Sequence, residues 1–265
     1  MRLTFIGFGE VGQRFAGQLS GMPDVQLAAY DLKFADPSAP NAGIAHSLGV
    51  TVATSAADAA NGADIVISAV TAMSARDVAK QAVEYLSNDQ IFCDINSISP
   101  NLKSQLSQTF LAAGKHYVEG AVMGPVAEPG IKVPILSGGA KARELATALN
   151  AVGMNVTPVT EVVGRAAATK LCRSIMIKGI EALIIELQAA SSHWQVEDDV
   201  FASLAQTFPS INWPQMHEVM SSRVRRHGVR RAGEMRECAD MLDEMGRSGE
   251  IARAIANVHE KHATT

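Results

Sequence analysis

Residues 3–12 read LTFIGFGEVG: a short strand-like run, followed directly by a G-x-G-x-x-G pattern whose glycines are Gly7, Gly9 and Gly12. The residues that follow, Val11–Leu19, have the apolar spacing of an amphipathic helix. A strand, a glycine turn and a helix in this order predict a dinucleotide-binding turn. Its glycines permit a tight turn, a close approach of the backbone to a pyrophosphate and close helix packing, and the N–H groups of the helix N-terminus face the phosphates. The alternative is a glycine-rich turn that binds nothing, and the surrounding strand and helix disfavour it.

An acidic residue supports the same interpretation and indicates the cofactor. Asp31 follows the predicted strand Val25–Tyr30, about 20 residues after the glycine turn, where a carboxylate accepts hydrogen bonds from the adenosine ribose. A carboxylate there repels the 2′-phosphate of NADP, and Lys33 nearby weakens that repulsion. We therefore expect NAD, with NADP as the alternative.

The chain up to Pro158 alternates short β-branched runs with alanine-rich helical segments such as Ala75–Leu86 and Ala142–Leu149. This alternation predicts an α/β fold, a Rossmann doubly wound parallel sheet. The expected strands are Leu3–Ile6, Val25–Tyr30, Ile65–Ala69, Ile91–Asp94, Tyr117–Val122, Pro134–Ser137 and Asn155–Pro158.

No strand pattern follows Pro158. The stretch from Glu161 to about Ser192 contains no proline and predicts one long interdomain helix, and the remainder predicts an all-α C-terminal domain. We expect residues 1–160 to form the NAD(P)-binding Rossmann domain and residues 161–265 to form a helical substrate and dimerisation domain. An apolar interdomain helix with little cover predicts a homodimer, with the C-terminal helices in the interface.

Composition excludes several classes of protein. The net charge of −4 is not that of a general nucleic-acid binder, and the arginine cluster Arg223–Arg236 has acidic neighbours and no interleaved aromatic residues. It predicts a solvated helix face, or one arginine that clamps a substrate carboxylate. The three cysteines, Cys93, Cys172 and Cys238, lie far apart, which predicts no disulfide framework, no metal site and a reducing cytoplasmic location.

Membrane association and secretion are not expected. The chain has no signal peptide pattern, since a strand-like run and the glycine turn follow Arg2 at once. The longest apolar region, Ile175–Leu187, is too short and too charged to span a bilayer.

Three further segments carry a family resemblance: DINSISP at Asp94–Pro100, EGAVMGP at Glu119–Pro125 and GRAAATK at Gly164–Lys170. They resemble the nicotinamide loop, the substrate loop and the lysine helix of the β-hydroxyacid dehydrogenases. That family includes 3-hydroxyisobutyrate dehydrogenase and, more distantly, 6-phosphogluconate dehydrogenase. The resemblance implies hydride transfer between a nicotinamide and a small β-hydroxy acid or related alcohol. Met123–Pro125, Lys178-Gly179 and Arg230–Met235 resemble a side branch with a C-terminal domain of unknown function.

Two positions depart from the family pattern. Met123 stands where the family has a serine that holds the substrate carboxylate, and Ser174 stands where it has an asparagine. These departures motivate an imine or ketone reductase of the same architecture as an alternative. A non-catalytic dinucleotide-binding protein is a third hypothesis, and it alone predicts that Lys170 is dispensable.

The resemblance implies that Lys170 is the general acid/base, and the apolar run after it favours a buried helix over a solvated lysine. Ser174, one helical turn after Lys170, is expected to orient the lysine or to bind substrate. For Lys178 two interpretations stay open: it binds a substrate anion, or it only extends its amine to solvent. The expected catalytic residues are Lys170 and Ser174. The expected cofactor-binding residues are Gly7, Phe8, Gly9, Glu10, Val11, Gly12, Asp31, Val70, Thr71 and Asn96, and the expected substrate-binding residues are Ser97, Met123, Gly124 and Lys178.

Overall fold

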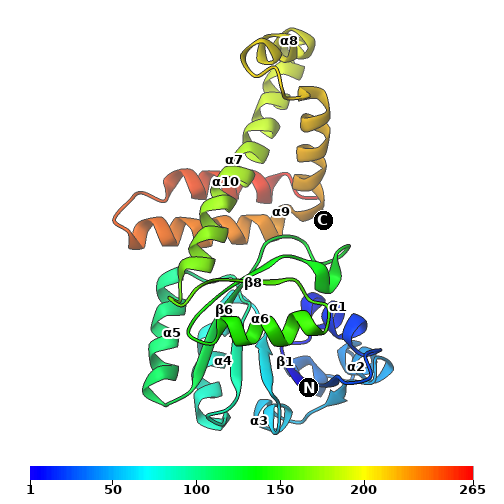
Figure 1. Cartoon of the computed structure of the whole chain (residues 1–265). Coiled ribbons are helices and arrows are strands. Elements are labelled where there is room, and N and C mark those ends of the chain that lie inside the picture. Colours follow the sequence, from blue (N-terminus) through cyan, green and yellow to red (C-terminus); the bar gives the residue numbers. More distant parts are fainter. Residues whose placement is uncertain (265) are drawn as a thin grey trace. The chain divides into compact units, whose positions relative to one another are not determined.

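A computed structural model describes residues 1–264, and its chain divides into two compact units, Met1–Lys170 and the part from Leu171 onward (Figure 1). The first unit holds one eight-stranded sheet with helices, and the second consists of helices.

The sheet of the first unit has the strand order β3-β2-β1-β4-β5-β6-β7-β8. Strands β1 to β6 are all parallel to one another. Strand β7 is antiparallel to β6, and β8 is parallel to β7. The strands are β1 (Arg2–Ile6), β2 (Gln26–Tyr30), β3 (Thr51–Val52), β4 (Ile65–Ser68), β5 (Ile91–Asp94), β6 (His116–Val122), β7 (Ile135–Gly138) and β8 (Val156–Thr160).

The predicted α/β Rossmann sheet is confirmed, but the expectation that all strands are parallel is wrong for β7 and β8. A parallel connection needs a crossover of about a dozen residues or more, usually a helix. The connection from β6 to β7 contains no α-helix, only the short 3-10 turn η2 (Gly130–Lys132), and β7 pairs with β6 in the opposite direction. Strand β3 was not predicted, because two residues are too few to show an alternating pattern.

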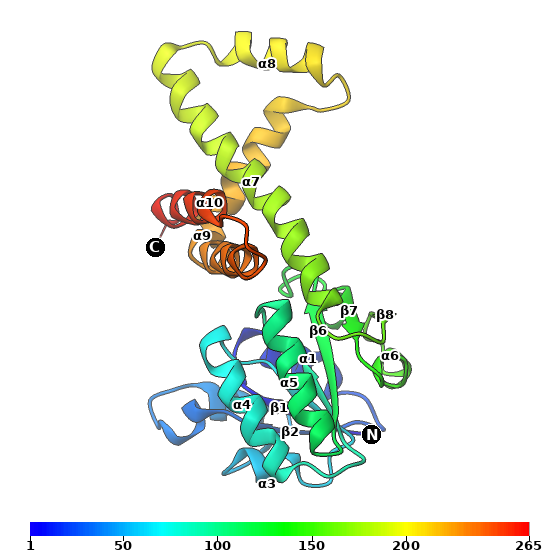
Figure 2. The same cartoon turned by 90° about the vertical axis from the view of Figure 1, so that its left-hand side faces the viewer.

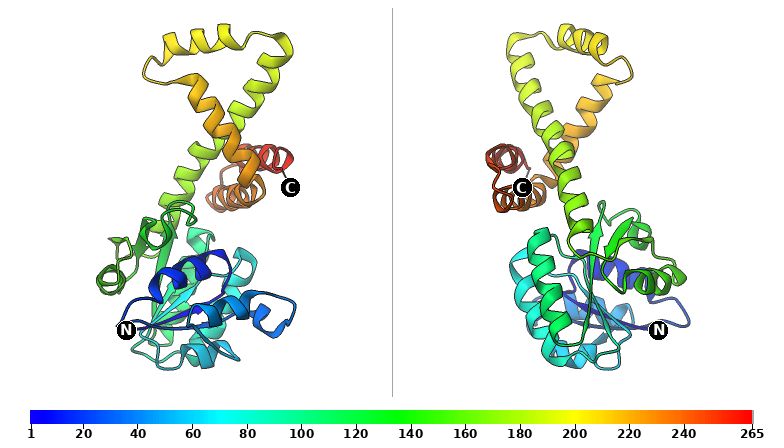
Figure 3. Two further views of the ribbon diagram at one scale, coloured as in Figure 1. Left: turned by 90° about the vertical axis from the view of Figure 1, so that its right-hand side faces the viewer. Right: turned by 60° about the vertical axis from the view of Figure 1, so that its left-hand side comes forward.

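Helices cover both faces of this sheet, and each face has its own apolar core (Figure 3). One core includes Phe15 of α1 and Leu145 of α6; the other includes Phe92 of β5 and Phe110 of α5, whose rings lie 5.0 Å apart. Helices α4 and α5 run side by side on the second face (Figure 2). The helices of this unit are α1 (Glu10–Leu19), η1 (Leu32–Ala35), α2 (Asn41–Ser47), α3 (Ala56–Ala60), α4 (Ala72–Tyr85), α5 (Pro100–Ala112) and α6 (Ala142–Ala151).

Helix α7 (Arg165–Trp194) begins in the first unit and continues into the second, close to the predicted span. The second unit adds α8 (Glu197–Thr207), α9 (Trp213–Glu244) and α10 (Glu250–Lys261). Its core joins α9 and α10 through small and apolar side chains such as Met235, Cys238 and Ala256. Within residues 1–264, no helix is both long enough and apolar enough to cross a membrane.

Candidate functional site

The three glycines of the turn after β1 meet different surroundings. Gly7 has φ +93°, and a Cβ there would lie 2.4 Å from the carbonyl oxygen of Ala69. A Cβ on Gly12 would lie 2.8 Å from the carbonyl oxygen of Gly7, whereas one on Gly9 would meet nothing within 4 Å. Gly7 and Gly12 therefore make the turn possible, while Gly9 leaves open space at the N-terminus of α1. That space beside free N–H groups fits a pyrophosphate.

The carboxylate of Asp31 is fixed beside this turn by two main-chain donors. The N–H of Phe8 donates to Oδ2 at 2.6 Å, and the N–H of Lys33 donates to Oδ1 at 2.9 Å. The carbonyl of Phe8 in turn accepts from Gln13 at 2.9 Å and from the buried Asn41 at 3.0 Å. Sequence reasoning missed Asn41, because it lies in a separate helix and belongs to no motif.

Asn96 connects the loops that follow β4 and β5. Its Oδ1 accepts the N–H of Val70 at 2.7 Å, and its Nδ2 donates to the hydroxyl of Ser68 at 3.0 Å. Thr71, the residue before α4, is exposed, and its hydroxyl lies 3.1 Å from that of Ser74. The structure thus places Val70 and Asn96 together, beside the Ala69 carbonyl that Gly7 approaches.

A buried polar group at the end of β5 holds the same loop. Asp94 accepts the main-chain N–H of Asn96 at 2.9 Å and the hydroxyl of Tyr117 at 2.7 Å, and the Lys103 ammonium lies 3.5 Å from its carboxylate. Burial, together with the charge of Asp94, raises the pKa of Tyr117 well above its usual value, so its hydroxyl stays protonated and donates. Lys103 and Tyr117 carry no sequence signal, because each resembles an ordinary residue of a helix or strand.

Lys170 and Ser97 come together in the first unit. The Lys170 ammonium donates to the Ser97 hydroxyl, and both side chains are partly buried. Ser97 follows the Asp94–Asn96 loop, so this pair lies at the same carboxyl edge of the sheet as the glycine turn.

Met123 and Gly124 follow directly after β6 and are partly exposed. The N–H of Met123 donates to the carbonyl of Pro134 at 2.9 Å, which ties this loop to the start of β7. Glu119, the first residue of the segment that resembles the substrate loop, lies inside β6, within the predicted strand Tyr117–Val122, and is fully buried.

In the second unit, Ser174 and Lys178 are both buried on α7. The Lys178 ammonium donates to the Ser174 hydroxyl at 3.1 Å and forms an ion pair with Glu234 of α9 at 2.6 Å. A carboxylate therefore already compensates the charge of Lys178.

The prediction of a solvated arginine face is wrong for Arg231, which is 9% exposed. It donates to both carboxylate oxygens of Glu181, at 2.9 and 2.7 Å. Nε2 of the buried His259 lies 3.1 Å from the Lys178 carbonyl oxygen, and burial lowers the pKa of this histidine and raises that of Glu181. The sequence does not single out Arg231, because its partner Glu181 lies on a different helix.

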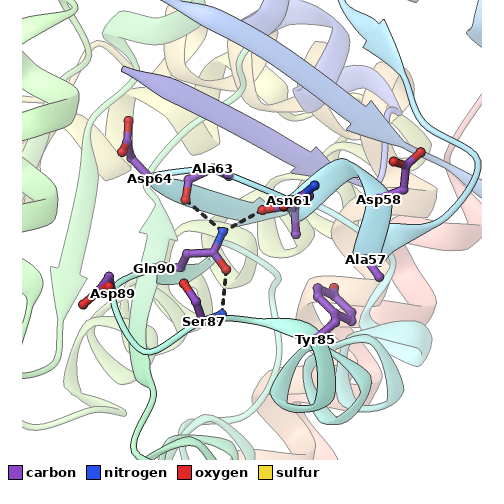
Figure 4. Close-up of a pocket in the computed structure, with 11 residues that line it drawn as sticks. Ala57, Asp58, Asn61, Ala63, Asp64, Tyr85, Ser87, Asp89 and Gln90 are labelled. Atoms are coloured by element: carbon purple, nitrogen blue, oxygen red, sulfur yellow. Dashed lines mark hydrogen bonds between the residues drawn. The ribbon is translucent and has the colours of Figure 1, made fainter.

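A separate pocket of about 420 Å³ lies at the amino ends of β4 and β5 (Figure 4). Gln90 organises it by donating to the carbonyls of Ala60 and Ala63 at 2.6 and 2.9 Å. Asp58, Asp64 and Asp89 also line it, yet among residues 1–264 no group of three such side chains is arranged to hold a metal ion. Open α/β sheets bind ligands at the opposite, carboxyl ends of their strands.

Two family models match most of the chain. Residues 2–164 match the family model described as the NAD binding domain of 6-phosphogluconate dehydrogenase, and residues 192–262 match a domain of unknown function, DUF1932. A conserved hypothetical protein from Sinorhizobium meliloti 1021 is 38% identical, with 99% of this chain and 88% of that chain covered and a TM-score of 0.85.

A second solved structure is a conserved protein of unknown function that is described as structurally similar to 3-hydroxyacid dehydrogenases. It is 31% identical, with 99% of this chain and 96% of that chain covered and a TM-score of 0.80. An imine reductase from Myxococcus stipitatus, solved with NADP⁺, shares the fold at 18% identity and a TM-score of 0.62, covering 98% of this chain and 93% of that one. A variant of that reductase was solved with NAD⁺.

Proposed function

Because the chain belongs to the family with the NAD-binding domain of 6-phosphogluconate dehydrogenase, here followed by a DUF1932 domain, we propose that it is a nicotinamide-dependent oxidoreductase. The family resemblance predicted from the sequence is confirmed, and the fold is that of 3-hydroxyacid dehydrogenases and imine reductases. In this proposal residues 1–160 bind the cofactor, and residues 161–265 contribute to substrate binding and dimerisation.

The observation that carries the proposal is the hydrogen bond between Lys170 and Ser97 at the sheet edge that bears the glycine turn. A bound nicotinamide supplies the hydride acceptor or donor. Oxidation of an alcohol also requires a group that takes the hydroxyl proton, and reduction requires one that returns it. We assign this proton transfer to Lys170, with Ser97 orienting the ammonium and contacting the substrate.

We propose that the N–H groups around Gly9, Glu10 and Val11 bind the cofactor phosphates, and that Asp31 binds the adenosine ribose. The nicotinamide end of the cofactor would then contact Val70, Thr71 and Asn96. The fixed carboxylate of Asp31 favours NAD, because a 2′-phosphate would approach a negative charge that cannot turn away. The imine reductase solved with NADP⁺ keeps NADP as the alternative cofactor.

The substrate that we propose is a small β-hydroxy acid or related alcohol, framed by Ser97, Met123 and Gly124, and Ser174 of α7 stays a predicted catalytic residue. A cyclic imine or a ketone is the second candidate. Two observations favour it: Met123 offers no hydroxyl to a carboxylate, and Glu234 neutralises Lys178, the cation that would otherwise receive an anion. A catalytically inactive dinucleotide-binding protein is the third.

We also propose a homodimer with the C-terminal helices in its interface. Large apolar side chains of the second unit are exposed, among them Met176 at 64% and Leu183 at 70%, two turns apart on α7, and Ile251 of α10 at 74%. Such side chains are typical of a surface that a second copy covers.

Turnover of a panel of β-hydroxy acids, ketones and cyclic imines, each with NAD(H) and NADP(H), tests the function. A dehydrogenase oxidises at least one hydroxy acid, and an imine reductase consumes reduced cofactor only with the imines or ketones. Tight cofactor binding without turnover of any panel member would contradict both enzymatic assignments and favour the non-catalytic protein.

A further inference from the structure

Glu119 is a fully buried carboxylate at the start of the helix that carries Lys170, and both of its oxygens accept hydrogen bonds. Its Oε1 accepts the N–H groups of Gly164 at 2.7 Å and Ala166 at 3.0 Å, and its Oε2 accepts that of Ala167 at 3.1 Å. The first N–H groups of a helix have no partner within the helix. One side chain from the middle of β6 therefore caps the N-terminus of α7, the helix that carries Lys170 in its second turn.

The charge of Glu119 is compensated by this helix end. The side chain is 0% exposed, and within residues 1–264 it takes part in no salt bridge. A buried carboxylate without compensation is strongly unfavourable, whereas three N–H donors and the positive end of a helix dipole stabilise it. The bond between strand and helix is thus charge-assisted and resists displacement.

Two glycines allow the close packing around this contact, Gly138 at the Glu119 side chain and Gly164 at the start of α7. A Cβ on Gly138 of the neighbouring strand β7 would lie 2.5 Å from Oε1 of Glu119. Gly164 has φ +106°, and a Cβ there would lie 2.9 Å from the hydroxyl of Ser104, which itself donates to the carbonyl of Val163 at 3.0 Å. The chain entering α7 is therefore fixed in place at several consecutive residues.

The other half of the pair is held from the adjacent position of the sheet. Glu119 is the register partner of Asp94 across β5 and β6, and Asp94 fixes the loop that leads to Ser97. Two neighbouring carboxylates thus fix the two partners of one hydrogen bond: Asp94 fixes the loop that leads to Ser97, and Glu119 fixes the start of the helix that carries Lys170. We infer that Glu119 is a positioning residue, which acts through the first turn of α7 to place the Lys170 ammonium against Ser97. This inference rests on the proposed role of Lys170.

The test separates positioning from mere stabilisation by a double-mutant cycle. Glu119→Gln keeps one oxygen for Gly164 and Ala166 but places an NH₂ group against the N–H of Ala167. We expect kcat, on the substrate identified by the panel, to fall by about 10-fold, since small misplacements of a reacting group are costly. NADH affinity should change by less than about 2-fold, because the glycine turn is untouched.

In a Lys170→Ala background, Glu119→Gln should cause no further loss of kcat, because it acts only through the lysine. A full additional 10-fold loss, or wild-type kcat in the single Glu119→Gln variant, would overturn the inference. Wild-type kcat in Lys170→Ala alone would instead overturn the proposed function.

Hydrogen exchange gives a reading that needs no substrate. Amides of the peptide covering residues 164–170 should exchange faster in Glu119→Gln than in the wild type, while those of α3 stay unchanged. Ser55→Ala is the matched control, because Ser55 caps α3 in the same unit by accepting the N–H of Asp58 at 3.0 Å. It should speed exchange in α3 and leave kcat unchanged. Unchanged exchange at residues 164–170 in Glu119→Gln would contradict the inference independently of any activity.

Discussion

The Lys170 side chain has a testable chemical role. Lys170→Ala is expected to lower kcat by about 10²–10⁴-fold, the usual contribution of a general acid or base, with little change in NADH affinity. Lys170→Arg should not restore activity, because a guanidinium does not release its proton near neutral pH. Steady-state kinetics with calorimetric NADH titration check both variants, and near-wild-type turnover of Lys170→Ala would refute the assignment.

Asp31 is expected to set the choice of cofactor. Its carboxylate is held by the N–H groups of Phe8 and Lys33, so NADH should bind more tightly than NADPH. Asp31→Ala should narrow this difference, because it removes the repulsion of the 2′-phosphate. Calorimetric titration of wild type and variant with both cofactors is the measurement. Equal or tighter NADPH binding by the wild type would contradict the assignment.

The raised pKa of Glu237 on α9 leads us to expect that the stability of the fold depends on pH. Burial, with the charges of Asp240 and Glu244, raises its pKa from 4.5 to about 7. The folded state therefore holds this proton more tightly than the unfolded state, and ionisation between pH 4.5 and about 7 lowers stability. Because the side chain is partly exposed, we expect an effect of about 1 kcal/mol.

Glu237→Gln should accordingly raise the melting temperature by about 2–4 °C at pH 8 and by much less at pH 5. Thermal unfolding of both proteins at the two pH values decides this. An equal gain at both pH values would show that the carboxylate charge is not responsible.

Sequence reasoning identified single residues only where a local pattern carries the chemistry. The glycines, Asp31, Asn96 and Lys170 stand in short segments that the sequence singles out, and the structure places the Lys170 ammonium against the Ser97 hydroxyl, while the functional roles of these residues stay predictions. Asn41 and Lys103 had no such pattern, since each acts through partners on other elements.

Alanine substitutions at two glycines of the glycine turn should have opposite effects on stability and on NADH binding. Gly9 has extended backbone angles, φ −82° and ψ −155°, and open space beyond its Cα. Gly9→Ala should therefore preserve the melting temperature and weaken NADH binding by at least about 10-fold, because the new methyl group occupies the phosphate space.

Gly7→Ala should instead destabilise the fold, because its φ is +93° and its Cβ would meet the Ala69 carbonyl oxygen at 2.4 Å. Thermal unfolding and NADH titration of the two variants form one matched experiment. If Gly9→Ala bound NADH as tightly as the wild type, the phosphates would not lie at this turn.

Elements were predictable when they were long enough to show their periodicity. The seven longer strands of the N-terminal part and helix α7 match their predicted positions within a few residues, whereas β3 and α3 are too short to show a period. The direction of β7 was not predictable from its own residues, because it depends on the connection that precedes it.

For the whole molecule we expect a homodimer. Light scattering should give about twice the 28.0 kDa mass of one chain at micromolar concentration. Leu183→Asp places a charge on an exposed apolar position of α7, and it should shift the protein toward the monomer without lowering the helical content. Val159→Asp, at a 45% exposed position on β8, is the control. A 28.0 kDa particle in the wild type would rule out the dimer.

The contact between Glu119 and the start of α7 also has a consequence for the order in which the chain is expected to fold during synthesis. Translation delivers β6 well before Gly164, Ala166 and Ala167, so while the ribosome is between these points the Glu119 carboxylate has none of its donors. Burying it at that stage would leave an ionised group unpaired in the sheet, which is strongly unfavourable. We therefore expect the nascent sheet to complete its packing only after the first turn of α7 has left the exit tunnel. For the same reason, a recombinant fragment that stops where the NAD-binding family match stops, at residue 164, omits two of the three donors that its own core requires.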